Sequence, residues 1–477
     1  MVTWCKNWWS RPYGGRAVMV IALPLIISAG SWQIMHFCDR LFLLGYDKVQ
    51  MAASMPAGMM IFSLTCLPLG VASYANTFVG QYHGAGRPRN IGLAIWQGVF
   101  IGLIAFPCIL ATAPFIQHFF SLTSDSPLLV EYETTYYRIA ALGSGGVIIA
   151  GALGAFYSGR GKPRPVMWVA LMTAGINILL DYLLIFGYLG LPEMGIAGAA
   201  LATSIAQWFS VAAYAFLLSR GNLSEKYGLR EGRRFNWDLF LRFWRYGGPA
   251  GLQFFIEIVA FSGFVVLMGK ISNDATAATA LAFNMDGLAF IPMIGMGIAV
   301  AALVGQCLGD NRPRDARRVT WTALTIGLVY TGFFCILFLF WPNLLLSLHI
   351  WFSDPAEFEP IRQMTVLLMR FIAFFCMFDC CCAVLAGTLK GAGDTQYLFW
   401  VTALLAPTST IIIGFGIICF GWGLVPCWWT VTIWISIQGI LYFLRVLGPK
   451  WEKMRVIEPE LLPTTPAESG GETVQVF

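Results

Sequence analysis

The stretch VGQYHGAGRPR at residues 79–89 recurs as VGQCLGDNRPR at residues 304–314. The two copies are identical at seven of eleven positions. Two prolines, Pro24 and Pro249, are separated by the same interval as the two copies. This internal repeat predicts that the chain consists of two structurally related halves. The alternative interpretation is a duplicated turn that has no bearing on mechanism.

The composition is that of a membrane protein. Of the 477 residues, 58% are hydrophobic and 12% are charged, whereas soluble globular domains carry about 25% charged residues. The net charge of +5 is too small for a basic nucleic-acid-binding surface, so we expect no nucleic-acid partner. The 50 glycines show no collagen period and suit close contacts between helices in lipid. The chain is therefore predicted to cross a lipid bilayer several times.

Twelve segments are long and apolar enough to cross the roughly 30 Å hydrocarbon core of a bilayer as helices. They are residues 17–38, 52–79, 91–116, 134–158, 165–188, 194–219, 240–269, 277–305, 319–342, 362–388, 397–420 and 424–446. In each half, the repeated motif closes the second of these segments.

The longest polar segment inside the chain, residues 220–238, separates the first six apolar segments from the last six. We therefore predict an all-α polytopic membrane protein with 12 transmembrane helices in two six-helix lobes. The N-terminal lobe comprises residues 1–219, and a cytoplasmic linker comprises residues 220–238. The C-terminal lobe comprises residues 239–447. Residues 448–477 form a cytoplasmic tail with little apolar content, which we expect to be disordered.

Basic residues fall mainly on one side of the predicted membrane. When the loops are assigned to alternate sides, the side of the N-terminus receives 24 of the 30 Lys and Arg residues. Cytoplasmic loops of membrane proteins carry an excess of these residues. We therefore expect both termini in the cytoplasm and the protein in a plasma membrane, which in a bacterium is the inner membrane.

The repeat also has a consequence for function. Because six spans separate the two copies of the motif, both halves have the same orientation in the membrane. Transporters built from such parallel repeats bind their substrate between the halves, near the middle of the bilayer. No phosphate-binding GxxxxGK[ST] motif occurs in the chain, so transport driven directly by ATP is not expected.

Further elements follow in a fixed order along the two halves. In the first half they are Pro24, Asp39 near the end of the first span, and VGQYHGAGR at residues 79–87. In the second half they are Pro249, FFIE at 254–257, FD at 378–379 and GTLKGAGDT at 387–395. On this six-plus-six topology, residues 15–447 resemble the multidrug and toxic compound extrusion (MATE) family of secondary transporters. The resemblance implies two lobes around a central cavity and drug export driven by inward Na⁺ or H⁺.

Three acidic residues lie deep in apolar segments of the second half. An uncompensated charge at the centre of a transmembrane helix costs about 2.5–3.5 kcal/mol on insertion scales, so each acid there needs a reason. The resemblance implies that Glu257 and Asp379 face each other as a cation or proton site, although either could be a structural, hydrogen-bonded acid. Asp286 departs from the small polar residues usual in the family. It could face the cavity, complete the Glu257–Asp379 cluster, or bond to a kinked segment near Pro292.

The first half contains a second candidate cation or proton site. Asn177 and Asp181 are four residues apart and therefore share one face of their predicted helix. Asp39 matches the acid of the family at that position. Two alternatives remain open: Asp39 could form an exposed ion pair with Arg40 at a helix end, and Asp181 could satisfy a helix terminus.

Candidate substrate-contacting residues are fewer. Met51, Met55 and Met59 recur every four residues, and a flexible, polarizable stripe suits a cavity that accepts many compounds. Ordinary helix packing is the alternative interpretation of this stripe. Asn284, two residues before Asp286, completes the set of predicted cavity residues.

These observations predict a monomeric, non-enzymatic antiporter that exchanges Na⁺ or H⁺ for amphipathic, cationic organic compounds. No cofactor is expected besides the coupling ion, and no resident metal site. A flippase for lipid-linked saccharides or lipids is the alternative, but it calls for several cationic side chains where this chain has acids. An intramembrane enzyme would need a catalytic set, which four histidines scattered along the chain do not suggest. Because Asp39 adjoins Arg40 and the second-half acids have no fixed counter-charge nearby in sequence beyond Arg370, we favour the C-terminal lobe for coupling.

Overall fold

The computed structural model describes residues 8–123, 126–220, 222–352 and 355–458. Within these residues the regular secondary structure is helical, and no β-strand occurs. Among them, 12 segments are helical, long and apolar enough to cross a membrane. The prediction of an all-α protein with 12 transmembrane helices is therefore confirmed.

Six of these segments belong to each half. In the first half they are α2 (Gly15–Tyr46), α3 with α4 (Lys48–Ser73 and Ala75–Gly84), α5 (Pro88–Leu110), α7 (Pro127–Gly159), α8 (Arg164–Phe186) and α9 (Ile196–Ser219). In the second half they are α11 with η2 and α12 (Trp237–Arg242, Phe243–Gly247 and Gly248–Gly269), α13 (Asn273–Gly309), α14 (Pro313–Phe340), α16 (Pro355–Ala392), α17 (Thr395–Phe420) and α18 (Leu424–Leu447). The shorter helices are α6 (Ile116–Thr123), η1 (Tyr188–Gly190), α10 (Leu223–Lys226), α15 (Pro342–Phe352) and η3 (Trp451–Lys453).

Local sequence signals explain where several of these helices begin. Pro88, Pro127 and Pro313 lie at the start of α5, α7 and α14, where the missing N–H of proline costs no helical hydrogen bond. The Asp47 carboxylate caps α3 by accepting a hydrogen bond from the N–H of Val49 at 2.6 Å, which satisfies a donor left free at the start of the helix.

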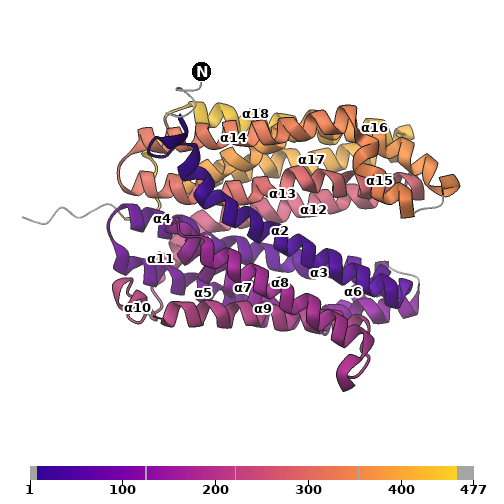
Figure 1. Cartoon of the computed structure of the whole chain (residues 1–477), viewed down its shortest axis with the longest axis horizontal. Helices are drawn as coiled ribbons and strands as arrows, with labels where there is room; N and C mark the ends of the chain where they lie inside the picture. Colours follow the sequence, from indigo (N-terminus) through magenta and orange to yellow (C-terminus); the bar gives the residue numbers. More distant parts are fainter. Residues whose placement is uncertain (1–7, 124–125, 221, 353–354, 459–477) are drawn as a thin grey trace, which may run out of the picture.

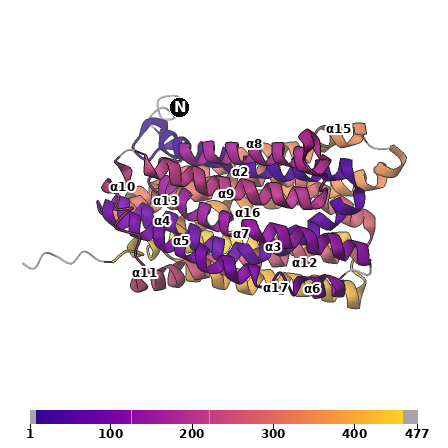
Figure 2. The same cartoon turned by 90° about the horizontal axis from the view of Figure 1, so that it is seen from below.

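The helices of the two halves lie side by side with their axes roughly parallel (Figure 1). In that view α13, α14, α16 and α18 lie on one side and α5, α7, α8 and α9 on the other. The junctions α4–α5, α7–α8 and α13–α14 and the linker with α10 and α11 lie at one end, which we call the basic end because most Lys and Arg residues occur there. The opposite end carries α6 and α15 (Figure 2).

The first helix of each half crosses from one half to the other. Val18 and Leu25 of α2 belong to a buried cluster formed mainly by the second half, whereas Leu43 belongs to the cluster of the first half. In the same way, Ala250 of α12 packs in the first half and Phe264 in the second. The division at residues 219 and 239 stays a prediction, but at these two helices the lobes are interlocked.

Close backbone approaches at these crossings follow the interval of the sequence repeat. A Cβ on Gly70 would lie 2.6 Å from the Cα of Gly251, and a Cβ on Gly295 would lie 2.6 Å from the N of Ile26. Gly295 is the counterpart of Gly70 in the repeat, and Gly251 is the counterpart of Ile26, so the same contact is made twice. The structural repeat therefore extends well beyond the repeated motif at residues 79–89 and 304–314.

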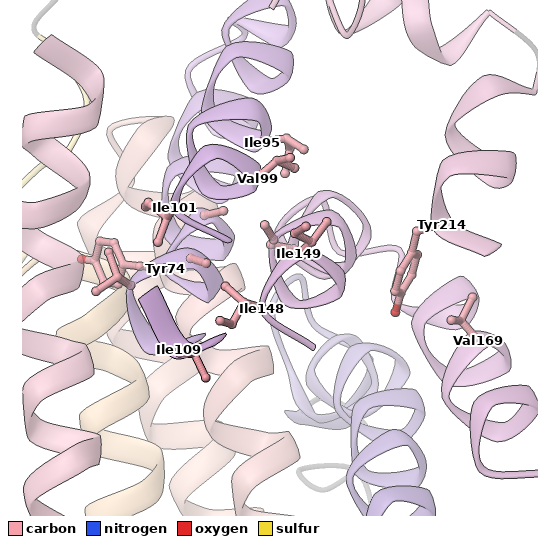
Figure 3. Packing of buried hydrophobic residues seen from close by; sticks show 14 of the residues in the cluster. Tyr74, Ile95, Val99, Ile101, Ile109, Ile148, Ile149, Val169 and Tyr214 are labelled. Atoms are coloured by element: carbon pink, nitrogen blue, oxygen red, sulfur yellow. The ribbon is translucent and has the colours of Figure 1, made fainter. Parts of the chain in front are cut away.

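Each half has buried hydrophobic clusters of its own. Figure 3 shows part of the cluster of the first half, to which α5 contributes Ile101 and α7 contributes Ile148 and Ile149. These two helices approach closely at Gly102, because a Cβ there would lie 2.6 Å from the Cγ1 of Ile149. Such contacts are too tight to allow sliding without repacking, so α5 and α7 are held in a fixed register.

The two copies of the repeated motif meet each other and close the basic end. A Cβ on Gly84 would clash with the backbone carbonyl of Gln306, and a Cβ on Gly309 would clash with that of Gln81. The side-chain amide of Gln306 donates to the carbonyl oxygen of Gly159 at 2.7 Å, and that of Gln81 donates to the carbonyl of Gly391 at 3.0 Å. The duplicated sequence is thus a reciprocal contact between the halves and not merely a duplicated turn.

Candidate substrate cavity and carboxylate clusters

A cavity of about 780 Å³ lies between α2, α3, α7, α9 and α13. The residues that line it come from the parts of these helices nearer the opposite end, and the reciprocal contact of the motifs lies at the basic end. All four residues predicted from the sequence to contact substrate line this cavity: Met51, Met55, Met59 and Asn284. Their role in binding stays a prediction.

The cavity wall is apolar and aromatic, with few charges. Trp32 packs edge-to-face on His36 with ring centroids 4.4 Å apart, and its ring lies 5.8 Å from that of Phe62. Among the described lining residues, Asp39 and Arg40 are the only ones with a formal charge. A wall of this kind binds an apolar body through contact area and uses one or two polar groups to orient it.

Four residues from three helices form a cluster in the first half. Asn177 and Asp181 of α8 are completely buried and lie one turn apart. In the amide orientation that satisfies both of its polar atoms, Asn177 Nδ2 donates to Asp181 Oδ2 at 3.1 Å and Oδ1 accepts from the N–H of Thr203 at 3.3 Å. Asp39 of α2 is 5% exposed and interacts electrostatically with Asp181.

Both acids of this cluster have an oxygen without a partner. Oδ1 of Asp39 and Oδ1 of Asp181 are buried and accept no hydrogen bond from any described residue. No ion pair joins Asp39 to Arg40 within the described chain, and Asp39 is buried, so the alternative of an exposed helix-end pair does not hold. Asp181 bonds to Asn177 and lies five residues before the end of α8, so it does not satisfy the helix terminus.

In the second half, Glu257 of α12 is the centre of a hydrogen-bond network. Its Oε1 accepts from Gln438 Nε2 at 2.9 Å, from Gln253 Nε2 at 3.1 Å and from Thr402 Oγ1 at 3.4 Å. Gln438 is itself held by Tyr442, whose hydroxyl accepts from Gln438 Nε2 at 3.2 Å. These contacts come from α12, α17 and α18, so the carboxylate position depends on how three helices pack.

The two aspartates of the second half share one narrow pocket. Asp286 of α13 and Asp379 of α16 line it together with Thr331 of α14. Asp379 interacts electrostatically with both Asp286 and Glu257. Asp286 is 8% exposed, and its Oδ1 accepts no hydrogen bond among the described residues. Of the three possibilities open for Asp286, the structure favours a place in the Glu257–Asp379 cluster, inside the lobe and away from the large cavity.

One expectation about this cluster needs correction. The sequence suggested no fixed counter-charge near the second-half acids beyond Arg370. In the structure, Lys390 near the end of α16 interacts electrostatically with Glu257. The long stretch of chain between Glu257 and Lys390 hides this proximity in the sequence, and only the tertiary fold brings the two residues near each other.

Sequence reasoning also missed the residues that hold the acids. Gln253 lies four residues before Glu257, and Gln438 lies four residues before Tyr442, so each pair shares a helix face. Polar residues at this spacing in an apolar span are a usable signal. Thr203, which bonds to Asn177, and Thr402, which bonds to Glu257, carry no such signal, because isolated threonines are common in transmembrane helices and bond to their own backbone.

The MatE family model matches residues 24–183 and 249–415, which cover most of both halves. The chain belongs to the MATE family. It is therefore an integral membrane transporter and not an enzyme. It is 25% identical over 454 residues to a probable multidrug resistance protein NorM of Brucella suis, covering 92% of this chain and 93% of that one. It is 26% identical over 380 residues to a multidrug resistance protein NorM of Burkholderia vietnamiensis, covering 79% and 81%.

Solved structures of MATE transporters share its fold. An outward-facing multidrug resistance MATE transporter of the MOP superfamily superposes with a TM-score of 0.81 at 17% identity, covering 91% of this chain and 95% of that one. The eukaryotic MATE transporter AtDTX14 gives a TM-score of 0.79 at 18% identity, covering 92% and 96%. At these identities the likeness concerns the arrangement of helices alone.

Proposed function

We propose that this MATE protein is a cation-coupled multidrug antiporter that exports amphipathic organic compounds while Na⁺ or H⁺ enters. The NorM relatives are named for multidrug resistance, which supports export of foreign compounds. The observation that carries the proposal is the pairing of an apolar cavity with buried acids that each have one oxygen without a donor. Asp39, Asp181 and Asp286 each present a buried oxygen without a partner among the described residues. A proton or a small cation bound there would remove the cost of an isolated buried charge.

We further propose that the basic end faces the cytoplasm and that the membrane is the plasma membrane, the inner one in a bacterium. The excess of Lys and Arg at that end supports this orientation. The reciprocal Gly84–Gln306 and Gly309–Gln81 contacts would then close the cytoplasmic side. The conformation would be an outward-facing one, because the cavity is lined by the parts of the helices away from the basic end.

The coupling site is proposed to be the second-half cluster of Glu257, Asp379 and Asp286. Three carboxylates from three helices interact there, so binding of one cation would alter how α12, α13 and α16 pack. A ligand shifts a conformational equilibrium only if it binds the two states differently. Since the network on Glu257 spans α12, α17 and α18, movement of these helices would change the affinity of the site.

The substrate is proposed to be an amphipathic compound with a cationic group. Trp32, Phe62 and the methionine stripe supply the apolar contact area. Among the acids of the described chain, Asp39 alone lines the cavity, and it is the group that would attract the cation. A flippase function gains no support, because a diphosphate headgroup calls for several cationic side chains and Arg40 is the single Lys or Arg among the described lining residues.

The test is efflux from reconstituted vesicles under imposed ion gradients. Ethidium efflux should follow an inward Na⁺ or H⁺ gradient and stop when that gradient is collapsed, and lipid scrambling measured in the same vesicles should stay at the protein-free level. Gradient-independent lipid scrambling without ethidium efflux would establish the flippase and remove the antiporter.

A further inference from the structure

Residues beyond the last transmembrane helix, α18, also pack against the rest of the protein. Residues 451–458, WEKMRVIE, leave α18 and run across the basic end from the second half to the first. We call these residues the C-terminal strap. The structure differs here from the prediction of a disordered tail over 448–477, because residues 448–458 are placed and packed; the rest of that tail lies outside the described residues.

One end of the strap is anchored in the second half. Trp451 is completely buried in a core cluster formed mainly by that half, and its indole N–H donates to the carbonyl oxygen of Val446 at 2.9 Å. Beside it, Glu452 forms an ion pair with Arg317 of α14 at 2.6 Å. A fully buried tryptophan contributes a large apolar area, so this anchor moves with the second half.

The other end is anchored in the first half. Val456 is 2% exposed and belongs to the core cluster of the first half, against which Ile457 also packs. The N–H of Val456 donates to Gln81 Oε1 at 2.8 Å. Gln81 lies in the repeated motif and at the same time donates to the carbonyl of Gly391 in the second half. The strap thus bonds to the residue that closes the basic end.

The last described residue, Glu458, occupies a site built by three residues of the first half and by Arg242 of α11. Although α11 belongs to the second half in sequence, its Leu239 is buried in the core cluster of the first half. Its Oε2 accepts from the hydroxyl of Tyr82 at 2.9 Å and pairs with Arg242. Its Oε1 accepts from Asn90 Nδ2 at 3.2 Å, and its backbone carbonyl accepts from Arg87 at 3.1 Å. Both carboxylate oxygens and the backbone carbonyl are satisfied, which is the pattern of a carboxylate-binding site.

The length of the strap limits how far its two anchors can move apart. Five residue steps separate Trp451 from Val456, and a fully extended chain spans at most about 3.6 Å per residue, or about 18 Å in all. An antiporter with a closed basic end must open that end later in its cycle, which requires the halves to separate there. Separation beyond the reach of the strap demands that one anchor is released.

We propose that the C-terminal strap is a latch that holds the basic end closed, and that Tyr82, Arg87, Asn90 and Arg242 form a carboxylate-binding site whose ligand is Glu458. The proposal rests on alternating access, which is part of the proposed function. The latch goes beyond the proposed function, because it assigns a role to a segment outside the membrane that touches neither the cavity nor the buried acids. Release of Glu458 is then a step of the cycle.

The charge state of Glu458 fits this role. Burial opposes ionisation of the carboxyl, but a bond from its own backbone N–H, hydrogen bonds from Tyr82 and Arg242 and the Arg242 charge together hold its pKa below the ordinary value. The group is therefore ionised near neutral pH, and the latch is engaged there.

Distances between spin labels at the basic end test the proposal. The repeat supplies an equivalent pair of positions, Arg89 in the first half and Arg314 in the second, which are the last residues of the two motif copies. Both are replaced by cysteine and labelled in the full chain, in detergent and in vesicles. We expect one short distance for the parent pair and a longer component that rises at least threefold in Glu458→Ala.

The matched control is Glu225→Ala. Glu225 is an exposed acid of α10 at the same end and forms no ion pair with any described residue, so its removal changes the charge equally without touching the latch. A charge swap, Glu458→Arg with Arg242→Glu, should restore most of the short distance that Glu458→Arg alone loses, which is the coupling expected for a contacting pair.

The proposal is overturned if Glu458→Ala has the distance distribution of the parent and of Glu225→Ala. It is equally overturned if the charge swap restores nothing although both variants elute as folded protein. The distances require no substrate. A protein that shows the Glu458 response but no gradient-driven efflux would therefore contradict the proposed function and leave the latch in place.

Discussion

The contact between the two copies of the repeated motif can be tested with a single methyl group. In Gly84→Ala, the new Cβ would lie far inside the contact distance of the Gln306 carbonyl. That obstacle is backbone and not the tip of a flexible side chain, so the halves would have to separate by roughly 1.4 Å to reach ordinary contact. The substitution therefore raises the free energy of the closed basic end and not that of a state in which this end is open.

The expected magnitude follows from overpacking. An extra methyl group in a close-packed contact costs typically about 1–3 kcal/mol, and about 1.4 kcal/mol corresponds to a factor of ten in an equilibrium. The ratio of closed to open basic end should thus fall by about 5- to 140-fold. Gly309→Ala, the same change in the other copy, should have an effect of similar size because the contact is reciprocal.

The assay is the distance between spin labels at positions 89 and 314. Gly332→Ala in α14 is the control, because among the described residues no atom beyond its own stretch of helix lies within 4 Å of a Cβ built there. This change should leave the distance unchanged and favour the helix by about 1 kcal/mol through propensity. If Gly84→Ala gives the parent distance distribution while remaining folded, the motif contact does not close the basic end.

Three further outcomes are expected. Glu458 has a lowered pKa in the folded chain, so its contribution to closure is fully present above the ordinary glutamate pKa of about 4.3 and is lost only as pH falls through the lower folded value. The 89–314 distance in the parent should therefore stay the same between pH 7.5 and 5.5. An opening over that range that Glu458→Gln abolishes would contradict this expectation. Arg40 is the one Lys or Arg of the described cavity wall, and its charge repels a cationic substrate. Arg40→Gln should therefore lower the KM for ethidium about fivefold, which corresponds to about 1 kcal/mol for a charge about 4 Å away in water. An unchanged or higher KM would place Arg40 outside the binding region. Asp286→Asn should reduce gradient-driven efflux at least tenfold, and its combination with Asp379→Asn should be no worse than either change alone, whereas a multiplicative loss would show that the two acids act separately.

The fold was largely accessible from the sequence, because its main signals are local. Twelve apolar segments, a polar linker at residues 220–238 and a repeat with a fixed interval need no knowledge of distant contacts. What the sequence did not show is that α2 and α12 cross between the halves. Val18 and Ala250 are apolar residues that could pack against either half, and only the close approaches at Gly295 and Gly70 decide which.

The candidate sites were accessible only in part. Acids in apolar spans stand out individually, so Asp39, Asp181, Glu257, Asp286 and Asp379 could all be selected. The surroundings of these acids could not be predicted, because Thr402, Gln438 and Lys390 reach Glu257 from distant parts of the chain. The strap was missed for a different reason. The composition of residues 448–477 as a whole is polar, and the few apolar residues that anchor it, Trp451 and Val456, lie at its beginning.

The proposed coupling site is tested by comparing ion-coupled efflux in two variants, Glu257→Gln and Asp181→Asn, reconstituted in vesicles with imposed Na⁺ or H⁺ gradients. Each amide keeps the shape of the acid and removes its ability to exchange charge. We expect Glu257→Gln to abolish gradient-driven ethidium efflux and Asp181→Asn to retain a response to the gradient. Loss of the ion response in Asp181→Asn with retention in Glu257→Gln would place the coupling site in the first half and overturn its assignment to Glu257, Asp379 and Asp286.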